Sequence, residues 1–137
     1  MFLSGVLRGN SNVRQPTRSV FEAMGGAEAF RRLVETFYDG VETDPILRPM
    51  YPADLSDARR HLTLFLMQYW GGPTTYSAER GQPRLRARHV GFAIDVATRN
   101  AWLTHMRAAV ETMNLPSEAR DELVRYFEGA ADFLINR

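Results

Sequence analysis

The feature that most constrains this chain is an apolar pattern with the period of an α-helix, which recurs along most of its length. In the clearest window the apolar residues stand three or four positions apart: Phe30, Leu33, Val34, Phe37 and Val41. This spacing places them all on one face of a helix. The best stretch with the alternation of a strand, residues 92–96, is short. The chain is therefore predicted to fold as an all-α domain.

Helix-breaking residues set the predicted bounds of the helices. Ser19 suits the N-cap of a short helix over 20–24 that Gly25-Gly26 ends. Four long helices are predicted over 27–43, 55–70, 98–113 and from Ser117 onward, each next to a glycine or proline signal.

The segments between the long helices are predicted to be irregular, with one exception. Residues 46–52 form a connector flanked by prolines, and a short helix over 85–92 would carry His89. Residues 74–84 have neither period and are predicted to be a loop. A loop of this length is uncommon in a small domain and is often functional.

The size and charge of the chain fit one globular domain. The 137 residues can bury one core, and residues 19–137 are expected to form it behind a flexible N-terminal tail, residues 1–18. The absence of cysteine excludes disulfides and fits a cytoplasmic protein. The 17 basic residues, all arginine, nearly balance 16 acidic ones, which argues against a dedicated nucleic-acid or membrane-surface protein. No stretch approaches the roughly 20 apolar residues that span a bilayer.

Three histidines, His61, His89 and His105, are the candidate metal ligands, because a neutral imidazole binds haem iron and other metals. His61 and His105 border apolar helix faces, where a packed or surface histidine is the usual explanation. His89 differs because it follows a run of arginines, a setting that suits a cofactor with carboxylates of its own. No two histidines have the HExxH or i, i+4 spacing of a zinc site. One axial histidine is still enough for haem.

Two other groups of side chains have both a structural and a functional interpretation. Tyr38, Tyr51 and Trp102 carry polar hydrogens that need partners if they are buried. They could pack in the core, or together hold a bound, anion-like ligand. The arginines of the segment 80–88 could be solvated, contact nucleic-acid phosphates or pair with cofactor carboxylates.

Five blocks of this sequence resemble the truncated haemoglobins, specifically their second group. The blocks are FEAMGG at 21–26, the pair Phe37-Tyr38, LRPMYP at 47–52, the stretch 65–89 with QYWGGP and RLRARH, and AWLTHM at 101–106. The resemblance extends over about residues 20–136. It implies a two-over-two helical sandwich, with the helices of Phe37 and of residues 55–70 as one pair and those of Trp102 and Phe127 as the other.

The resemblance also assigns residues to a haem pocket. His89 matches the proximal ligand of the iron in haem b. Residues expected on the distal side, where a gas binds, are Trp102, Tyr38, Tyr51, Ala58 and Leu62. The methyl group of Ala58 stands where larger globins have a distal histidine and would leave the side entrance open. Residues expected to hold the rest of the cofactor are Phe37 and, near the propionates, Arg88 and Tyr76.

The implied function is binding of oxygen, CO and NO at a pentacoordinate haem iron. Release of oxygen is expected to be slow, because hydrogen-bond donors in a dry pocket stabilise negative charge on the ligand. Slow release suits redox chemistry with nitric oxide or peroxide, served by an unknown reductase or electron donor, in a monomer or homodimer. Enzymatic activity, as a nitric-oxide dioxygenase or peroxidase, is left open. The alternative is a haem-free helical module that binds nucleic acid through Arg80 to Arg88.

Overall fold

A computed structural model describes residues 19–137, and the predicted tail, residues 1–18, lies outside the described residues. The elements in chain order are the helices α2 (Val20–Ala23) and α3 (Gly26–Glu42), the 3₁₀ turn η1 (Arg48–Met50), and the helices α4 (Ser56–Tyr69), α5 (Thr75–Arg80), α6 (Leu85–Arg88), α7 (Val96–Glu111) and α8 (Ser117–Phe133). The described residues contain no β-strand, which confirms the predicted all-α class.

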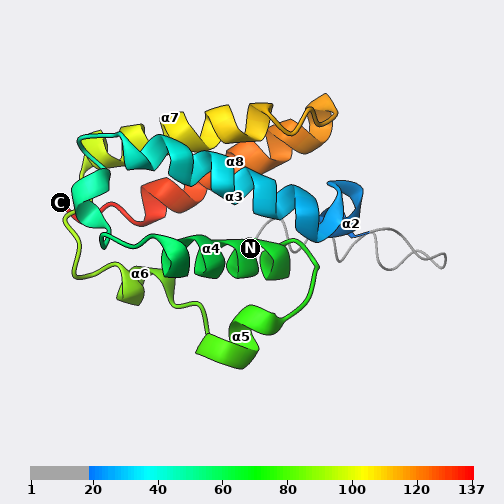
Figure 1. Cartoon of the computed structure of the whole chain (residues 1–137), viewed down its shortest axis with the longest axis horizontal. Coiled ribbons are helices and arrows are strands. Elements are labelled where there is room, and N and C mark those ends of the chain that lie inside the picture. The colour runs from blue at the N-terminus through cyan, green and yellow to red at the C-terminus, as the bar shows by residue number, and fades with distance from the viewer. Residues whose placement is uncertain (1–18) are drawn as a thin grey trace.

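The four long helices form two pairs (Figure 1). Helix α3 packs on α4, and α7 packs on α8, while further contacts between α3 and α7 join the two pairs. The two-over-two arrangement is therefore confirmed. The short helix α5 packs on α4, on the side away from α3 in the view of Figure 1. Within residues 19–137, every helix is too short or too polar to cross a bilayer.

The apolar face predicted for the first long helix forms the centre of the core. The side chains of Phe30, Leu33, Val34, Phe37 and Val41 are all 0% exposed on α3. Burial of such side chains is worth about 1.5–3 kcal/mol each relative to exposure. This one helix face therefore supplies a large share of the apolar burial that holds the two pairs together.

The predicted loop over residues 74–84 is wrong, because α5 occupies its first half. The helix is held from outside by the side chain of Gln68 on α4. Ser77 donates its main-chain N–H to Oε1 of Gln68 at 3.0 Å, and Nε2 of Gln68 donates to Oγ of Ser77 at 2.8 Å. Tyr76 is buried and packs edge-on against Phe65, with ring centroids 5.5 Å apart. These are contacts with another helix, so the spacing of apolar residues within 74–84 does not predict them.

The predicted helix over residues 85–92 is shorter than expected, since α6 ends at Arg88. His89 follows as its C-cap residue, and its main-chain N–H donates to the carbonyls of Leu85 and Arg86, both at 3.2 Å. The next residues leave the helical path and are bonded to the segment that follows α8.

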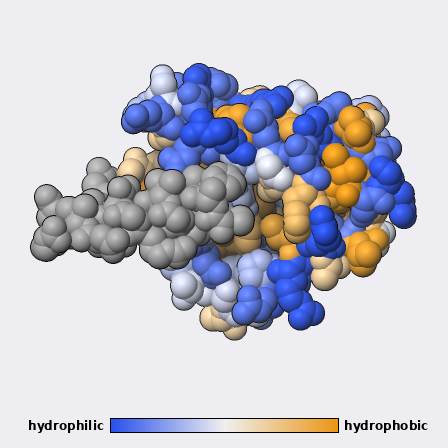
Figure 2. Space-filling view, turned by 180° about the vertical axis from the view of Figure 1, so that it is seen from behind, coloured by the Kyte–Doolittle hydropathy of each residue, from blue (hydrophilic) through white to orange (hydrophobic). Residues whose placement is uncertain are grey.

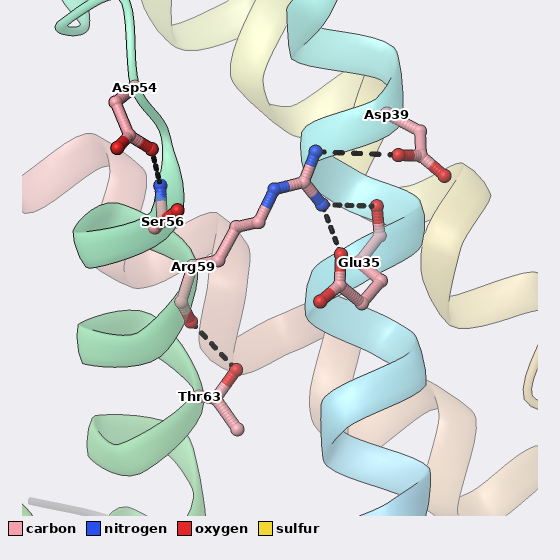
Figure 3. A network of polar contacts seen from close by, with 6 residues as sticks. All are labelled: Glu35, Asp39, Asp54, Ser56, Arg59 and Thr63. Atoms are coloured by element: carbon pink, nitrogen blue, oxygen red, sulfur yellow. Dashed lines mark hydrogen bonds and ion pairs between the residues drawn. The ribbon is translucent and has the colours of Figure 1, made fainter.

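Arg59 ties α4 to α3 beside the core (Figure 3). Its guanidinium pairs with the carboxylate of Glu35 and reaches Asp39 at 3.5 Å, and both partners lie on α3. The guanidinium carbon also stands 5.6 Å from the ring centroid of Tyr38. At the start of α4, Asp54 accepts the main-chain N–H of Ser56 at 2.9 Å. Together these contacts fix the position of α4 against the helix that carries Tyr38.

Gly40 marks a close approach of α3 to α7, and this leads to a stability prediction. A Cβ at Gly40 would collide with Nδ1 of His105 and lie 3.0 Å from two carbons of that ring. The ring has little freedom to move away, because Nε2 of His105 is bonded to Asp44 at 2.7 Å. We expect Gly40→Ala to lower the free energy of unfolding by about 1–3 kcal/mol in urea titrations.

Gly129 provides the matched control for this substitution. It lies within α8, and a Cβ there would meet nothing within 4 Å. Gly129→Ala should therefore raise stability by up to about 1 kcal/mol, the usual gain in helix propensity. Equal effects of the two substitutions would show that the approach of α3 to α7 does not restrict Gly40.

Candidate functional site

A cavity of about 210 Å³ is lined by all four long helices. Cores of this kind have few voids larger than a water molecule, so a cavity of this size is a ligand-site candidate. Most of its lining is apolar and includes Leu47, Met50, Leu62, Phe65, Ile94 and Phe127. The residues of the lining with polar or titratable groups include Tyr38, Tyr51, His89, Arg99, Trp102 and Tyr126.

His89 is the histidine of the cavity, and its hydrogen bond fixes which nitrogen is free. Nδ1 lies 2.6 Å from the carbonyl oxygen of Leu85. A carbonyl oxygen only accepts, so Nδ1 carries the proton and donates. In the neutral imidazole, Nε2 is then the nitrogen that carries the lone pair. This tautomer, with the second nitrogen oriented by a main-chain carbonyl, is the usual arrangement of a histidine that binds a metal.

The three polar aromatic residues predicted for the distal side line the same cavity. The rings of Tyr38 and Tyr51 meet edge to face, with centroids 5.5 Å apart. Tyr51 interacts by hydrogen bonding with both of the other residues, with Tyr38 and with the indole of Trp102. The three side chains thus gather their polar hydrogens around one cavity.

Burial keeps these phenols protonated. Burial is the main cause that raises the pKa of Tyr38, and the neighbouring Tyr51 adds to it. Burial also raises the pKa of Tyr51, and hydrogen bonding with Tyr38 and Trp102 opposes the rise. A phenol titrates near pH 10 without such shifts, so both side chains are neutral hydrogen-bond donors across the physiological range.

Asp44 and Arg48 position the segment that carries Tyr51. Asp44 accepts the main-chain N–H groups of Ile46 at 2.8 Å and Leu47 at 3.1 Å, and it is bonded to His105 of α7. The hydrogen bond from His105 is the main cause that lowers the pKa of Asp44. Arg48 donates to the carbonyl of Ala53 at 2.8 Å. The connector is thus fastened to α7, the helix that carries Trp102.

The other predicted site residues divide into those at the cavity and those behind it. Leu62 lines the cavity. Phe37 lies behind the lining, with its ring centroid 5.2 Å from that of Trp102. Ala58 is half-buried on α4 against the core and is not part of the lining.

Arg88 and Tyr76, predicted for the propionates, lie outside the cavity lining. Nε of Arg88 donates to the carbonyl of Pro83 at 2.7 Å, and Nη2 donates to that of Arg80 at 2.8 Å. The guanidinium carbon of Arg88 stands 5.9 Å from the ring centroid of Tyr76. In this arrangement Arg88 organises the turn before His89.

The residues of the cavity fit a haem group. Haem brings four nitrogen ligands of its own and needs an axial ligand from the protein. His89 lines the cavity, and Nε2 is its nitrogen that is not bonded to Leu85. The porphyrin is a flat apolar body, and the lining is largely apolar. Arg99 on α7 adds a positive charge to the lining, although Asp132 already pairs with it at 2.8 Å.

Two helix pairs around an apolar cavity with one free imidazole nitrogen define a globin of the two-over-two kind. Residues 19–136 match the model of the bacterial-like globin family. The group 2 truncated haemoglobin YjbI of Bacillus subtilis (strain 168) is 39% identical over 123 residues, which covers 90% of this chain and 92% of that protein.

Solved structures agree with this match. A thermostable haemoglobin from Thermobifida fusca superposes with a TM-score of 0.86 at 52% identity, covering 87% of this chain and 98% of that one. The truncated oxygen-avid haemoglobin from Bacillus subtilis superposes with a TM-score of 0.82 at 39% identity, covering 87% of this chain and 100% of that one. The chain therefore belongs to the bacterial-like globin family and, within it, to the group II truncated haemoglobins.

Membership of this family implies a haem cofactor and oxygen binding. It therefore favours the haem protein over the haem-free nucleic-acid module that the arginines of residues 80–88 also suggested. Sequence reasoning missed Arg99 and Tyr126 of the cavity lining. Around the site it also missed Asp44, Arg48 and Asn136. All three act on main-chain groups, and such contacts leave no recognisable spacing in a sequence.

Proposed function

We propose that this chain binds haem b in its cavity through Nε2 of His89, and that it takes up oxygen, CO and NO at a pentacoordinate iron. One observation carries the proposal. His89, whose Nδ1 is bonded to Leu85 and whose Nε2 is left for a ligand, lines the same apolar cavity as Tyr38, Tyr51 and Trp102. An axial base would hold the haem, and hydrogen-bond donors in the same cavity would govern how it binds oxygen.

The haem group would supply an iron that binds diatomic gases reversibly. The protein would supply the rest of the site. His89 would hold the cofactor, and Leu62, Phe65 and Phe127 would keep water away from it. The hydroxyl of Tyr51 would donate its hydrogen to oxygen in the cavity, and Tyr38 and Trp102, which interact with that hydroxyl by hydrogen bonding, would polarise it. A hydrogen bond of this kind strengthens as negative charge develops on the ligand.

Slow release of oxygen is the expected consequence, and it suits redox chemistry with nitric oxide or peroxide better than carriage. Support for slow release comes from the similar haemoglobin of Bacillus subtilis, which is described as oxygen-avid. The proposal includes a cytoplasmic monomer or homodimer without a nucleic-acid partner, and an electron donor that restores ferrous iron. It leaves enzymatic turnover open.

Absorption spectra of the purified protein test the haem proposal directly. Ferric, ferrous and CO-treated samples should each show a Soret band, and the ferrous spectrum should be that of a five-coordinate iron. A six-coordinate ferrous spectrum without added gas would contradict the pentacoordinate iron. Protein that takes up no added haemin would reject the proposal as a whole.

Trp102→Phe tests whether the indole contributes to oxygen retention. This substitution keeps most of the ring packing against Phe37 and Phe127 but removes the hydrogen bond to Tyr51. Loss of one such neutral hydrogen bond is worth about 0.5–1.5 kcal/mol, so oxygen should dissociate about 2- to 10-fold faster. Stopped-flow replacement of oxygen by CO measures the rate. An unchanged rate would remove Trp102 from the mechanism.

A further inference from the structure

The segment after His89, residues 90–95, gains little stability from burial. Val90 is 73% exposed and Phe92 is 42% exposed. The C-terminus lies at one end of the molecule (Figure 1). The view from behind in Figure 2 shows apolar side chains on the surface at that same end. Ile94 is the buried residue of the segment, and it lines the cavity. Other interactions must therefore fix the path of the chain from His89 to α7.

Asn136, which follows α8, supplies these interactions. Its Oδ1 accepts the main-chain N–H of Ile94 at 2.9 Å, and its Nδ2 donates to the carbonyl of Phe92 at 2.9 Å. Nδ2 also reaches the carbonyl of His89 itself at 3.4 Å. The main-chain N–H of Asn136 donates to the carbonyl of Ile94 at 2.8 Å. One short amide thus binds two main-chain groups of this segment and reaches the carbonyl of His89 just before it, using both its donor and its acceptor.

A second contact with the end of α8 lies before His89. Arg86 on α6 donates from Nη2 to the carbonyl of Phe133 at 3.3 Å. Its guanidinium carbon also stands 4.1 Å from the ring centroid of Phe133, within the range of a cation–π contact. The chain is therefore attached to the C-terminal region on both sides of His89. Before His89, Arg86 bonds to Phe133 at the end of α8. After His89, Phe92 and Ile94 are bonded to Asn136.

We infer that Asn136 is a positioning residue for the axial histidine, acting through the main chain of residues 89–94. This inference rests on the proposed role of His89 as the iron ligand. Two constraints set the position of the His89 ring. One is the path of its main chain, and the other is the hydrogen bond from Nδ1 of the ring to the carbonyl of Leu85. Removing partners that orient a metal ligand typically weakens metal binding by about 10- to 100-fold.

Two substitutions separate the roles of the amide. Asn136→Asp keeps the acceptor for Ile94 but places a carboxylate oxygen against the carbonyls of Phe92 and His89. Asn136→Ala removes both the donor and the acceptor. Asn136→Gln retains the amide one methylene further out and should recover part of the wild-type behaviour. Arg137→Ala is the matched control, because Arg137 donates its main-chain N–H to Ile94 at 3.2 Å and keeps that group as alanine.

Three measurements on the full-length protein follow the effect from the main chain to the iron. Hydrogen exchange at the amide of Ile94, with and without haem, should be about 3- to 10-fold faster in Asn136→Ala. Transfer of haem to excess apomyoglobin should be about 10-fold faster or more in Asn136→Ala and Asn136→Asp. The iron–histidine stretching band of the ferrous protein should shift or broaden in both, and stay unchanged in Arg137→Ala.

The outcomes distinguish this inference from the proposed function. Faster exchange together with a changed band and faster haem loss supports it. Unchanged hydrogen exchange at Ile94 in the Asn136 variants overturns the inference. Faster exchange with an unaltered iron–histidine band and unaltered haem loss also overturns it. Neither outcome contradicts the proposed role of His89 as the ligand. A wild-type ferrous protein without an iron–histidine band would reject the ligand role of His89, and the inference with it.

Discussion

Replacing His89 with glycine is expected to remove most of the Soret absorbance of the purified protein and to speed the loss of added haemin by more than about 100-fold. The reason is that His89 would provide the protein's bond to the iron, and even the removal of an outer partner of a metal ligand weakens binding by about 10- to 100-fold. Apolar contacts with the cavity lining would still hold some haemin loosely. Transfer to apomyoglobin measures the rate of loss.

Imidazole added to the His89→Gly protein is the rescue experiment. If the side chain acts as an axial base, free imidazole should enter the space it leaves and restore a Soret band like that of the wild type. His61→Ala serves as the control, because His61 lies outside the cavity lining, with its ring 3.2 Å from the guanidinium of Arg80. His89→Gly protein that retains haemin as firmly as the wild type would show that another group binds the iron.

The long helices could be predicted from the sequence because each one depends on a local pattern. Five apolar residues at helical spacing predict the buried face of α3, and every one of them is fully buried. Helix α5 could not be predicted in this way. It has six residues, and it depends on hydrogen bonds between Ser77 and Gln68, a residue of another helix. Periodicity reports which face of a helix is buried, but it does not report support from a neighbouring element.

The candidate site was predictable only in part. Residue chemistry marked His89 as the least ordinary of three histidines because of the arginines before it, and the resemblance to a known family then assigned it as the ligand. The structure brings His89 into one cavity with Tyr38, Tyr51 and Trp102, although they come from separate parts of the chain. It leaves Arg88 and Tyr76 outside the lining. Asp44 pairs with a histidine 61 positions further along the chain. Residues so far apart in the chain leave no recognisable sequence pattern, so the pair is seen only in the folded structure.

Under the proposed function, the distal donors would form an ordered set. Sequence reasoning treated Tyr38, Tyr51 and Trp102 as three equivalent donors toward a gas. In the structure Tyr51 is the residue whose hydroxyl interacts by hydrogen bonding with both of the others. The segment that carries Tyr51 is in turn fastened by Asp44 to α7. Under the proposed function, Tyr51 would therefore be the direct donor, and Tyr38 and Trp102 would support it.

Tyr51→Phe should accordingly have the largest effect of any single distal substitution on oxygen release. Removing a hydrogen bond to a charged acceptor is worth about 1.5–3 kcal/mol, so dissociation should be about 10- to 100-fold faster than in the wild type. The effect should exceed that of Trp102→Phe, because the indole would act through the Tyr51 hydroxyl. Stopped-flow replacement of oxygen by CO measures both variants, and the C–O stretching band of the CO form reports the loss of a donor independently.

The double variant Tyr51→Phe/Trp102→Phe tests whether the donors are ordered in this way. If Trp102 acts only through the hydroxyl of Tyr51, removing the indole from the Tyr51→Phe protein should change the oxygen dissociation rate no further. If the freed indole turns to the ligand once Tyr51 is gone, the double variant should release oxygen faster than the product of the two single effects. Effects that simply multiply would mean that each residue contacts the ligand independently, and would contradict the ordered set.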